Sequence, residues 1–466
     1  MRKQVSTSNI NTLLKSLWNW INANIIQISI FLSVAAYILI NSYLCGYFIS
    51  PDSSNYLREA QTLLNGNGFY YNAELGAVSF WSTWPIGYPF LIALTAFITH
   101  ADVYLASKIL TIVILAIINI IFYRRFKDTA WVYCLITLNA GLLTIFSYTW
   151  SEQPFILGLI WFVFAIYDIL RKEKPSKMNY ISLGAVVPFL FLSRYIGGFA
   201  LGVLGLVFLY LLYDYFKTKE KPKLQKTKTV FFVTIIDSII IFGYFAMNYL
   251  ITGHIGGGHS PAPESMSQLV LTLIRSEITE MQNIFAKYFS MTWIVTVLLW
   301  VLLAGITIYL IVKYTKEGKE KLRLPLISIS LGIIYSFAIV FMRFVIRFDP
   351  ISYRFLLPAT VLFCIGFISL SLANDKICSF VTVKNKWVRY IIALVLCLGL
   401  LYSPVHGVVD QINSDAPFES GYAKSVERVL EKYDGISHVN PDDIGGYYSN
   451  TAQLLRFNRL DIRGIS

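Results

Sequence analysis

Long apolar runs separated by short polar segments recur along the chain from residue 21 to residue 405. A helix needs about 20 apolar residues to cross the hydrocarbon core of a bilayer, and most of these runs approach that length. The pattern therefore predicts an all-α, polytopic membrane protein. The expected crossings, about eleven, are 21–48, 104–123, 129–149, 154–170, 179–193, 196–216, 229–251, 288–312, 325–346, 355–374 and 388–405.

A first outer loop is expected between about residues 49 and 103, and its pattern predicts two further helices. In 53–64, apolar residues recur with the period of a helix, and Gly66 and Gly68 end the pattern, which predicts an amphipathic helix. The run 87–99 is apolar but too short to cross, so we interpret it as an interfacial or partly inserted helix.

Charge sets the expected orientation. Basic residues gather between the apolar runs, as in Arg124-Arg125 and in 217–228, which holds six lysines. Basic loops stay in the cytoplasm, so we expect a cytoplasmic N-terminus and an extracytoplasmic tail in the plasma (inner) membrane. The net charge of +12 is then a signal of topology rather than of nucleic-acid binding.

Two parts follow from this orientation. Residues 1–405 form the expected transmembrane module, and 406–466 read as a small extracytoplasmic α/β cap. The five cysteines lie in or beside apolar runs and show neither a disulfide framework nor a CxxC metal motif.

Two carboxylates at the outer ends of expected helices are the first candidates for chemistry. Asp52 lies just beyond the first span, where it can cap the helix that follows or act as a general base. Glu152 lies in a short outer turn between two apolar runs, where it can be merely solvated or can share an aqueous pocket with Asp52.

Arginines at the same membrane face are the second set. Arg194 interrupts an apolar stretch, which marks a functional position or a snorkelling side chain in a short hairpin. The segment 343–354 carries Arg343, Arg347 and Arg354 beside Asp349. Arginine binds phosphate through a planar fork of donors, so this segment predicts a phosphate site; the alternative is an interfacial anchor paired through Asp349.

Several short motifs follow one another in a recognisable order over about 300 residues. They are Pro51–Ala60, Gly66–Gly68, Trp84–Pro89, Ser151–Pro154, Ser193–Tyr195, Asn248–Gly253 and Tyr353–Pro358. With them the chain resembles the GT-C superfamily of glycosyltransferases, and within it the protein-mannosyltransferase-like and aminoarabinose-transferase-like members.

The resemblance implies a membrane enzyme that takes a sugar from a polyprenyl-phosphate carrier at the extracytoplasmic face. It maps the catalytic acid of the first outer loop to Asp52 and a second acidic position to Glu152. Arg354, with Arg347 or Arg194, is then expected to bind the donor phosphate, and Tyr56 and Tyr353 complete the expected substrate-binding set.

We expect inverting transfer to an acceptor hydroxyl on a glycan, lipid or protein. No metal ligand is assigned and no cofactor is expected to be required, because this chain carries single acids where many relatives carry paired ones; a divalent metal stays an alternative. Two other functions remain open: a polysaccharide ligase or polymerase with a diphosphate-linked donor, and a lipid or sugar transporter. A transporter would need ionisable residues along its bundle, where Asp237 alone stands out.

Overall fold

The computed structural model describes residues 15–413 apart from 17, 45–49, 73–77, 81, 257–263, 286–292, 319, 347, 349 and 384. The α/β cap expected from 406 onwards therefore lies largely outside the described residues. Helices dominate the described part, which confirms the expected all-α fold, and the only strands described there are β1 (Tyr70–Asn72) and β2 (Val78–Phe80). These two strands form an antiparallel hairpin in which Tyr70 pairs with Phe80.

Eight segments of the described chain are long and apolar enough to cross a membrane, or nine if the bent pair α16 and α17 forms one crossing. The helices that contribute are α2 (Ile25–Leu44), α5 (Val103–Phe126), α8 (Glu152–Arg171), α10 (Phe199–Thr218), α11 (Lys221–Thr252), α13 (Trp293–Glu317), α14 (Glu320–Val345) and α15 (Tyr353–Leu372). The bent pair is α16 (Asp375–Val381) with α17 (Lys386–Asn413). The chain is thus a multi-pass membrane protein.

The expected single crossing over 129–149 is wrong. The segment is divided into η3 (Lys127–Thr129), α6 (Ala130–Cys134), η4 (Leu135–Leu138) and α7 (Ala140–Ser147). The break lies at Asn139, whose side chain accepts hydrogen bonds from the backbone N–H groups of Gly141 and Leu142 and so begins a new helix. The expected crossing over 179–193 corresponds to α9 (Lys177–Ser193), a shorter apolar helix.

Both helices expected in the first outer loop are present, as α3 (Pro51–Leu64) and α4 (Gly87–Thr99). Tyr56, Leu57 and Ala60 of α3 are buried, as the apolar stripe predicts. The start of α4 lies against the end of α9, because a Cβ atom at Gly87 would stand 2.4 Å from the carbonyl oxygen of Leu192. This close approach joins the outer loop to the helix bundle.

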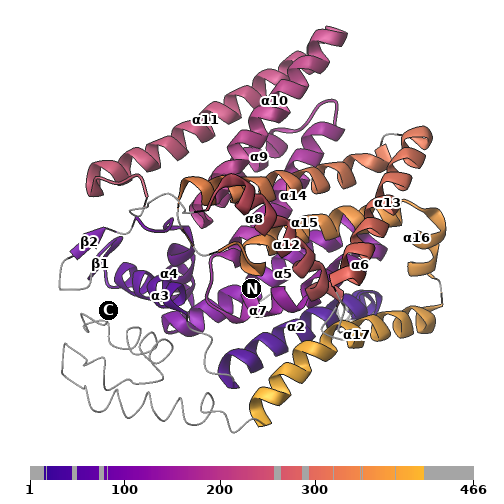
Figure 1. Ribbon diagram of the computed structural model, residues 1–466, viewed down its shortest axis with the longest axis horizontal. Coiled ribbons are helices and arrows are strands. Elements are labelled where there is room, and N and C mark those ends of the chain that lie inside the picture. Colours follow the sequence, from indigo (N-terminus) through magenta and orange to yellow (C-terminus); the bar gives the residue numbers. More distant parts are fainter. Residues whose placement is uncertain are drawn as a thin grey trace, which may run out of the picture.

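Figure 1 shows α3, α4 and the hairpin gathered at one end of the long helices α8, α14 and α15. Two apolar clusters support them, one centred on α2 to α7 and the other on α8 to α11 with α14 and α15. Helix direction fixes which ends coincide, since α8 begins at Glu152 and ends at Arg171, whereas α9 begins at Lys177. We call the end that holds Glu152 the acidic end and the opposite one the basic end.

Candidate active site

Four ionisable side chains from four separate elements meet at the acidic end. Asp52 comes from the first turn of α3, Glu152 from the first residue of α8, Arg194 from the segment after α9 and Arg354 from the first turn of α15. Nη2 of Arg354 donates to Oδ2 of Asp52 at 2.6 Å, and its Nε donates to Oε1 of Glu152 at 2.5 Å. Nη1 of Arg194 lies 2.5 Å from the same Oε1 of Glu152.

The two carboxylates have different environments. The side chain of Glu152 is 1% exposed and lies between the two guanidinium groups, whereas that of Asp52 is 21% exposed. A buried carboxylate is stable only when it is paired, and Glu152 is paired twice and lies at a helix N-terminus, where the helix dipole favours negative charge. Glu152 therefore holds the two arginines, and Asp52 is the carboxylate that solvent reaches.

Asp52 is not the N-cap of α3. That position belongs to Ser50, whose side chain accepts from the backbone N–H of Ser53, and Pro51 occupies the first turn with Asp52. Ser50 also accepts a hydrogen bond of 2.7 Å from Nε1 of Trp150. Because Ser50 supplies the cap, the carboxylate of Asp52 is available for its pair with Arg354.

Aromatic side chains fix the plane of Arg354. Its guanidinium lies over the ring of Trp150, 4.0 Å from the ring centroid, which is a cation–π arrangement. Trp150 is in turn stacked on Tyr148 with an interplanar angle of 4°. Stacking and two ion pairs restrict the guanidinium to one orientation, which is how arginine forms a preorganised site for a planar or tetrahedral anion.

Arg194 is positioned by the turn η5 (Tyr195–Gly198) that follows it. A Cβ atom at Gly197 would lie 2.3 Å from the carbonyl of Leu190, so only glycine lets the chain return this closely to α9. The sharp turn holds Arg194 at the acidic end, where its Nη1 also lies 3.3 Å from Oγ of Ser151.

Tyr56 joins the site through Ser151. The phenol and the Ser151 hydroxyl are 2.9 Å apart, and Tyr56 lies one helical turn beyond Asp52. Burial raises the pKa of Tyr56, and the negative charge of Asp52 raises it further. Tyr56 is therefore a neutral hydroxyl at physiological pH and can take part in hydrogen bonds but not in charge neutralisation.

A second set of hydrogen bonds fastens the outer loop over this region. The hydroxyl of Tyr195 donates to the carbonyl of Ser82 at 2.8 Å and accepts from Nδ2 of Asn248 at 3.0 Å. The hydroxyl of Tyr244 accepts from the backbone N–H of Ile86. Tyr195 and Asn248 belong to two of the motifs found in the sequence, and their structural role is to hold the segment between β2 and α4.

The sequence predictions for the site have mixed outcomes. The structure brings together Asp52, Glu152, Arg194, Arg354 and Tyr56, as the paragraphs above describe. Arg347 lies outside the described residues, and Tyr353 begins α15 with a side chain that is not described.

The alternative expected for 343–354, an interfacial anchor paired through Asp349, is not what the described residues show for Arg343. Arg343 is buried and pairs with Glu264 at 2.7 Å, so its described partner comes from the segment before α12 (Met266–Phe285). Asp349 lies outside the described residues. Arg343 is therefore an internal ion pair and not a member of the acidic-end cluster.

Sequence reasoning missed Ser50, Trp150 and Ser151 as parts of the site. The last two are neighbours of Glu152 in the turn that was singled out, so proximity to a candidate acid was an available signal. Ser50 carried the ordinary signal of a serine directly before proline at a helix start, which favours Ser50 over Asp52 as the cap.

Within the described residues, no group of three or more histidine, cysteine, aspartate or glutamate side chains lies close enough to hold a metal ion. Asp52 and Glu152 face guanidinium groups rather than each other. A divalent cation needs several oxygen ligands, and these two carboxylates as they stand do not fit that requirement.

No protein-family model and no curated protein matches the chain. Among solved structures, ArnT from Cupriavidus metallidurans in the apo state is 14% identical over 93% of this chain and 77% of its own, with a TM-score of 0.48. The same protein bound to undecaprenyl phosphate is 11% identical over 94% and 76%, also with a TM-score of 0.48.

The archaeal oligosaccharyltransferase AglB from Archaeoglobus fulgidus, in complex with an inhibitory peptide and a dolichol-phosphate, is 10% identical with a TM-score of 0.48. The match covers 92% of this chain and 63% of AglB. Both proteins are GT-C glycosyltransferases.

Proposed function

We propose that the protein transfers a sugar from a polyprenyl-phosphate carrier to an acceptor hydroxyl, with inversion, at its acidic end. The observation that carries this proposal is the cluster in which Arg354 joins Asp52 to Glu152 beside Arg194. It combines a carboxylate that solvent reaches with two guanidinium groups at the mouth of a membrane bundle. A lipid phosphate and a water-soluble acceptor can both reach such a place.

Asp52 is the proposed general base. It is the more exposed of the two carboxylates, and it lies in a helix that packs at the acidic end rather than within a membrane-spanning segment. A positioned general base contributes about 10²–10⁴ in rate. Asp52 would accept the acceptor's proton as the acceptor oxygen attacks the anomeric carbon.

Arg354 and Arg194 are the proposed phosphate ligands. The ion pairs of the described residues engage Nε and Nη2 of Arg354 and Nη1 of Arg194. A guanidinium carries five N–H donors, so both side chains have further donors to offer a phosphate. Trp150 stacks on the face of the Arg354 guanidinium and does not block these N–H donors, because they point outward in the plane of the group.

The charge balance supports this division of roles. The bond between the anomeric carbon and the phosphate oxygen breaks, its electron pair stays on that oxygen, and the acceptor oxygen forms the new bond. The phosphate thereby gains one negative charge while Asp52 gains the proton. Two preorganised guanidinium groups would stabilise the charge that develops on the leaving phosphate, and such electrostatic stabilisation is usually the largest single contribution to catalysis.

Glu152 is proposed as a positioning residue. With 1% of its side chain exposed, it lies behind the arginines and has little access to solvent. Its two ion pairs set the spacing between Arg194 and Arg354, and it acts on Asp52 only through Arg354.

Two steps test the proposal. Polyprenyl-linked sugars are first compared in cells with and without the protein, because the accumulating carrier identifies the donor. That donor is then supplied to the purified full chain, and transfer is measured for the parent and for Asp52→Asn. Asparagine keeps an acceptor towards Arg354 but removes the base, so we expect turnover to fall by about two or more orders of magnitude.

Arg354→Lys is the second arm. Lysine keeps the charge but cannot present a planar fork, so we expect weaker use of the donor. The matched control is Arg275→Lys on α12 (Met266–Phe285), an exposed arginine outside the cluster. Near-parent turnover of folded Asp52→Asn would refute the base assignment. Accumulation of a diphosphate-linked sugar instead would replace the proposed donor by that of a ligase or polymerase.

A further inference from the structure

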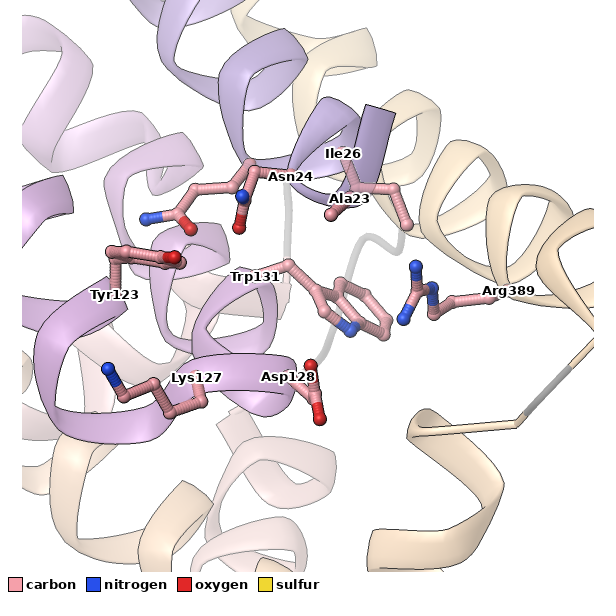
Figure 2. Close-up of a pocket in the computed structure, with 9 residues that line it drawn as sticks. Ala23, Asn24, Ile26, Tyr123, Lys127, Asp128, Trp131 and Arg389 are labelled. Carbon is pink, nitrogen blue, oxygen red and sulfur yellow. The ribbon is translucent and has the colours of Figure 1, made fainter. Parts of the chain in front are cut away.

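A polar pocket of about 140 Å³ lies at the basic end, far along the bundle from the proposed active site. Its walls come from the segment before α2 and from α2, α5, η3, α6 and α17. Figure 2 shows Arg389 of α17 extended towards the indole of Trp131, with Lys127 and Asp128 along one wall and Asn24 on the opposite one.

Two donors in this pocket have no hydrogen-bond partner among the described residues. They are Nε1 of Trp131 and Nε of Arg389. Trp131 is only 4% exposed. A buried donor without a partner costs about 1–3 kcal/mol, so such groups usually have a ligand or a water. Two unpaired donors that line one pocket indicate an acceptor-rich occupant.

The charge of the pocket indicates the sign of that occupant. Its lining carries two cations, Lys127 and Arg389, against one anion, Asp128. Lys127 has a positive φ of 50°, which is uncommon for a residue other than glycine. Its ammonium group lies 5.5 Å from the ring centroid of Tyr123, another lining residue. Net positive charge with free donors favours an anion.

An apolar groove of about 150 Å³ adjoins the pocket and shares Asn24, Gln27 and Tyr123 with it. The rest of its lining is mostly apolar and includes Phe31 and Ala116 between α2 and α5. The groove runs along two membrane-spanning helices, so an occupant that enters it lies at the depth of the acyl chains. The polar pocket and the apolar groove together match a molecule with an anionic head and a hydrocarbon tail.

We propose that this is a binding site for an anionic phospholipid of the leaflet at the basic end. The phosphate accepts from Nε1 of Trp131 and from Arg389, with Lys127 close by, and one acyl chain lies in the groove between α2 and α5. Basic pockets between membrane helices bind anionic head groups, and tryptophan and tyrosine favour the head-group level. The inference does not depend on the proposed transferase activity.

The test measures lipid binding to the purified full chain in a neutral detergent. Native mass spectrometry counts retained lipids, and the apparent Tm is followed while dioleoyl phosphatidylglycerol, dioleoyl phosphatidylcholine or inorganic phosphate is added. We expect a saturable rise in Tm with phosphatidylglycerol, because a ligand that binds only the folded state stabilises it. We expect little effect of phosphatidylcholine or of inorganic phosphate at the same concentrations.

Matched variants locate the site. Arg389→Gln should weaken phosphatidylglycerol binding by about five- to tenfold. Arg124→Gln removes the same charge from an exposed position at the basic end, outside the pocket lining, and should leave binding unchanged. Trp131→Phe keeps an aromatic ring without its N–H and should weaken binding in the same direction, which provides a second readout if Arg389→Gln fails to fold.

The groove has its own pair of variants. Ala116→Phe fills the groove and should reduce lipid retention, whereas Val113→Phe on the same helix is exposed outside the groove lining and should not. Equal effects of Arg389→Gln and Arg124→Gln would overturn the proposal. So would equal stabilisation by phosphatidylcholine, which would show an apolar groove alone, or by inorganic phosphate, which would show a free-anion site.

Discussion

At the scale of single residues, Arg354 decides how the two carboxylates of the site differ. It binds both, but Glu152 is enclosed by a second arginine while Asp52 keeps a path to solvent. A donor phosphate would bind the N–H donors of Arg354 that these ion pairs leave unused, next to Asp52. The residue proposed to bind the leaving phosphate is therefore also the one that pairs with the proposed base.

Glu59 provides a test of burial that is separate from the ion pairs. It lies on α3, is fully buried, and neither carboxylate oxygen has a hydrogen-bond partner among the described residues. Burial raises the pKa of Glu59 from an ordinary 4.5 to about 8, against a smaller opposing effect of Arg58. Between these two values the folded protein binds more protons than the unfolded chain, so stability falls as pH rises through that window.

Glu59→Gln is therefore expected to match the parent in stability near pH 4.5 and to exceed it near pH 9. The gain should be about 1–3 kcal/mol, since glutamine avoids a buried charge. Apparent Tm measured across this pH range checks the expectation, with Glu173→Gln as an exposed control that should show no such divergence. A constant difference between parent and Glu59→Gln at every pH would contradict a raised pKa in the folded state.

At the scale of elements, the start of α3 is the part that positions the proposed base. Ser50 caps the helix, accepts from Trp150, and lies two residues before Asp52. Trp150 in turn carries the guanidinium of Arg354 on its ring. One hydroxyl thus links the helix cap to the stacking partner of the arginine.

Ser50→Ala should reduce stability by about 0.5–2 kcal/mol through loss of the cap. Because Trp150 also loses its acceptor, transfer activity should fall even in folded protein. Ser50→Thr keeps the hydroxyl and should restore both properties, and apparent Tm with turnover of the purified variants provides the readout. Loss of both properties in Ser50→Thr as well would show that the size of the residue, rather than its hydroxyl, is what matters.

At the scale of the whole molecule, the helix directions separate an acidic end from a basic end. All four ionisable residues of the candidate site lie at helix ends on one side, while Arg124, Arg171 and Lys177 lie at the other. The positive-inside rule then predicts that the site faces the extracytoplasmic space.

Cysteine labelling in a cysteine-free background tests this orientation. Asn67→Cys, just after α3, should react with an impermeant thiol reagent added outside intact cells, and Thr218→Cys, at the end of α10, should not. Both positions are exposed, so accessibility to the reagent depends on the side of the membrane. Ser151 is unsuitable because it is fully buried. The reverse labelling pattern would place the candidate site in the cytoplasm.

Local patterns in the sequence were sufficient to predict the membrane class and the two helices of the first outer loop, and to single out Asp52, Glu152, Arg194 and Arg354 as candidates before their contacts were known. These features depend on residues that are near neighbours in the chain, such as the stripe of Tyr56, Leu57 and Ala60. Such periodicity reports which face of a helix is buried, whatever the rest of the fold does.

Only the tertiary structure decided which of these residues meet. Arg354 binds Asp52 across 302 positions of sequence, whereas Arg343, in the same segment, pairs with Glu264. It also decided that Ser50 rather than Asp52 caps α3, and that the run 129–149 breaks at Asn139. Ion pairs between distant segments depend on how helix ends come together in the packed bundle, and hydrophobic patterns along one segment hold no information about that.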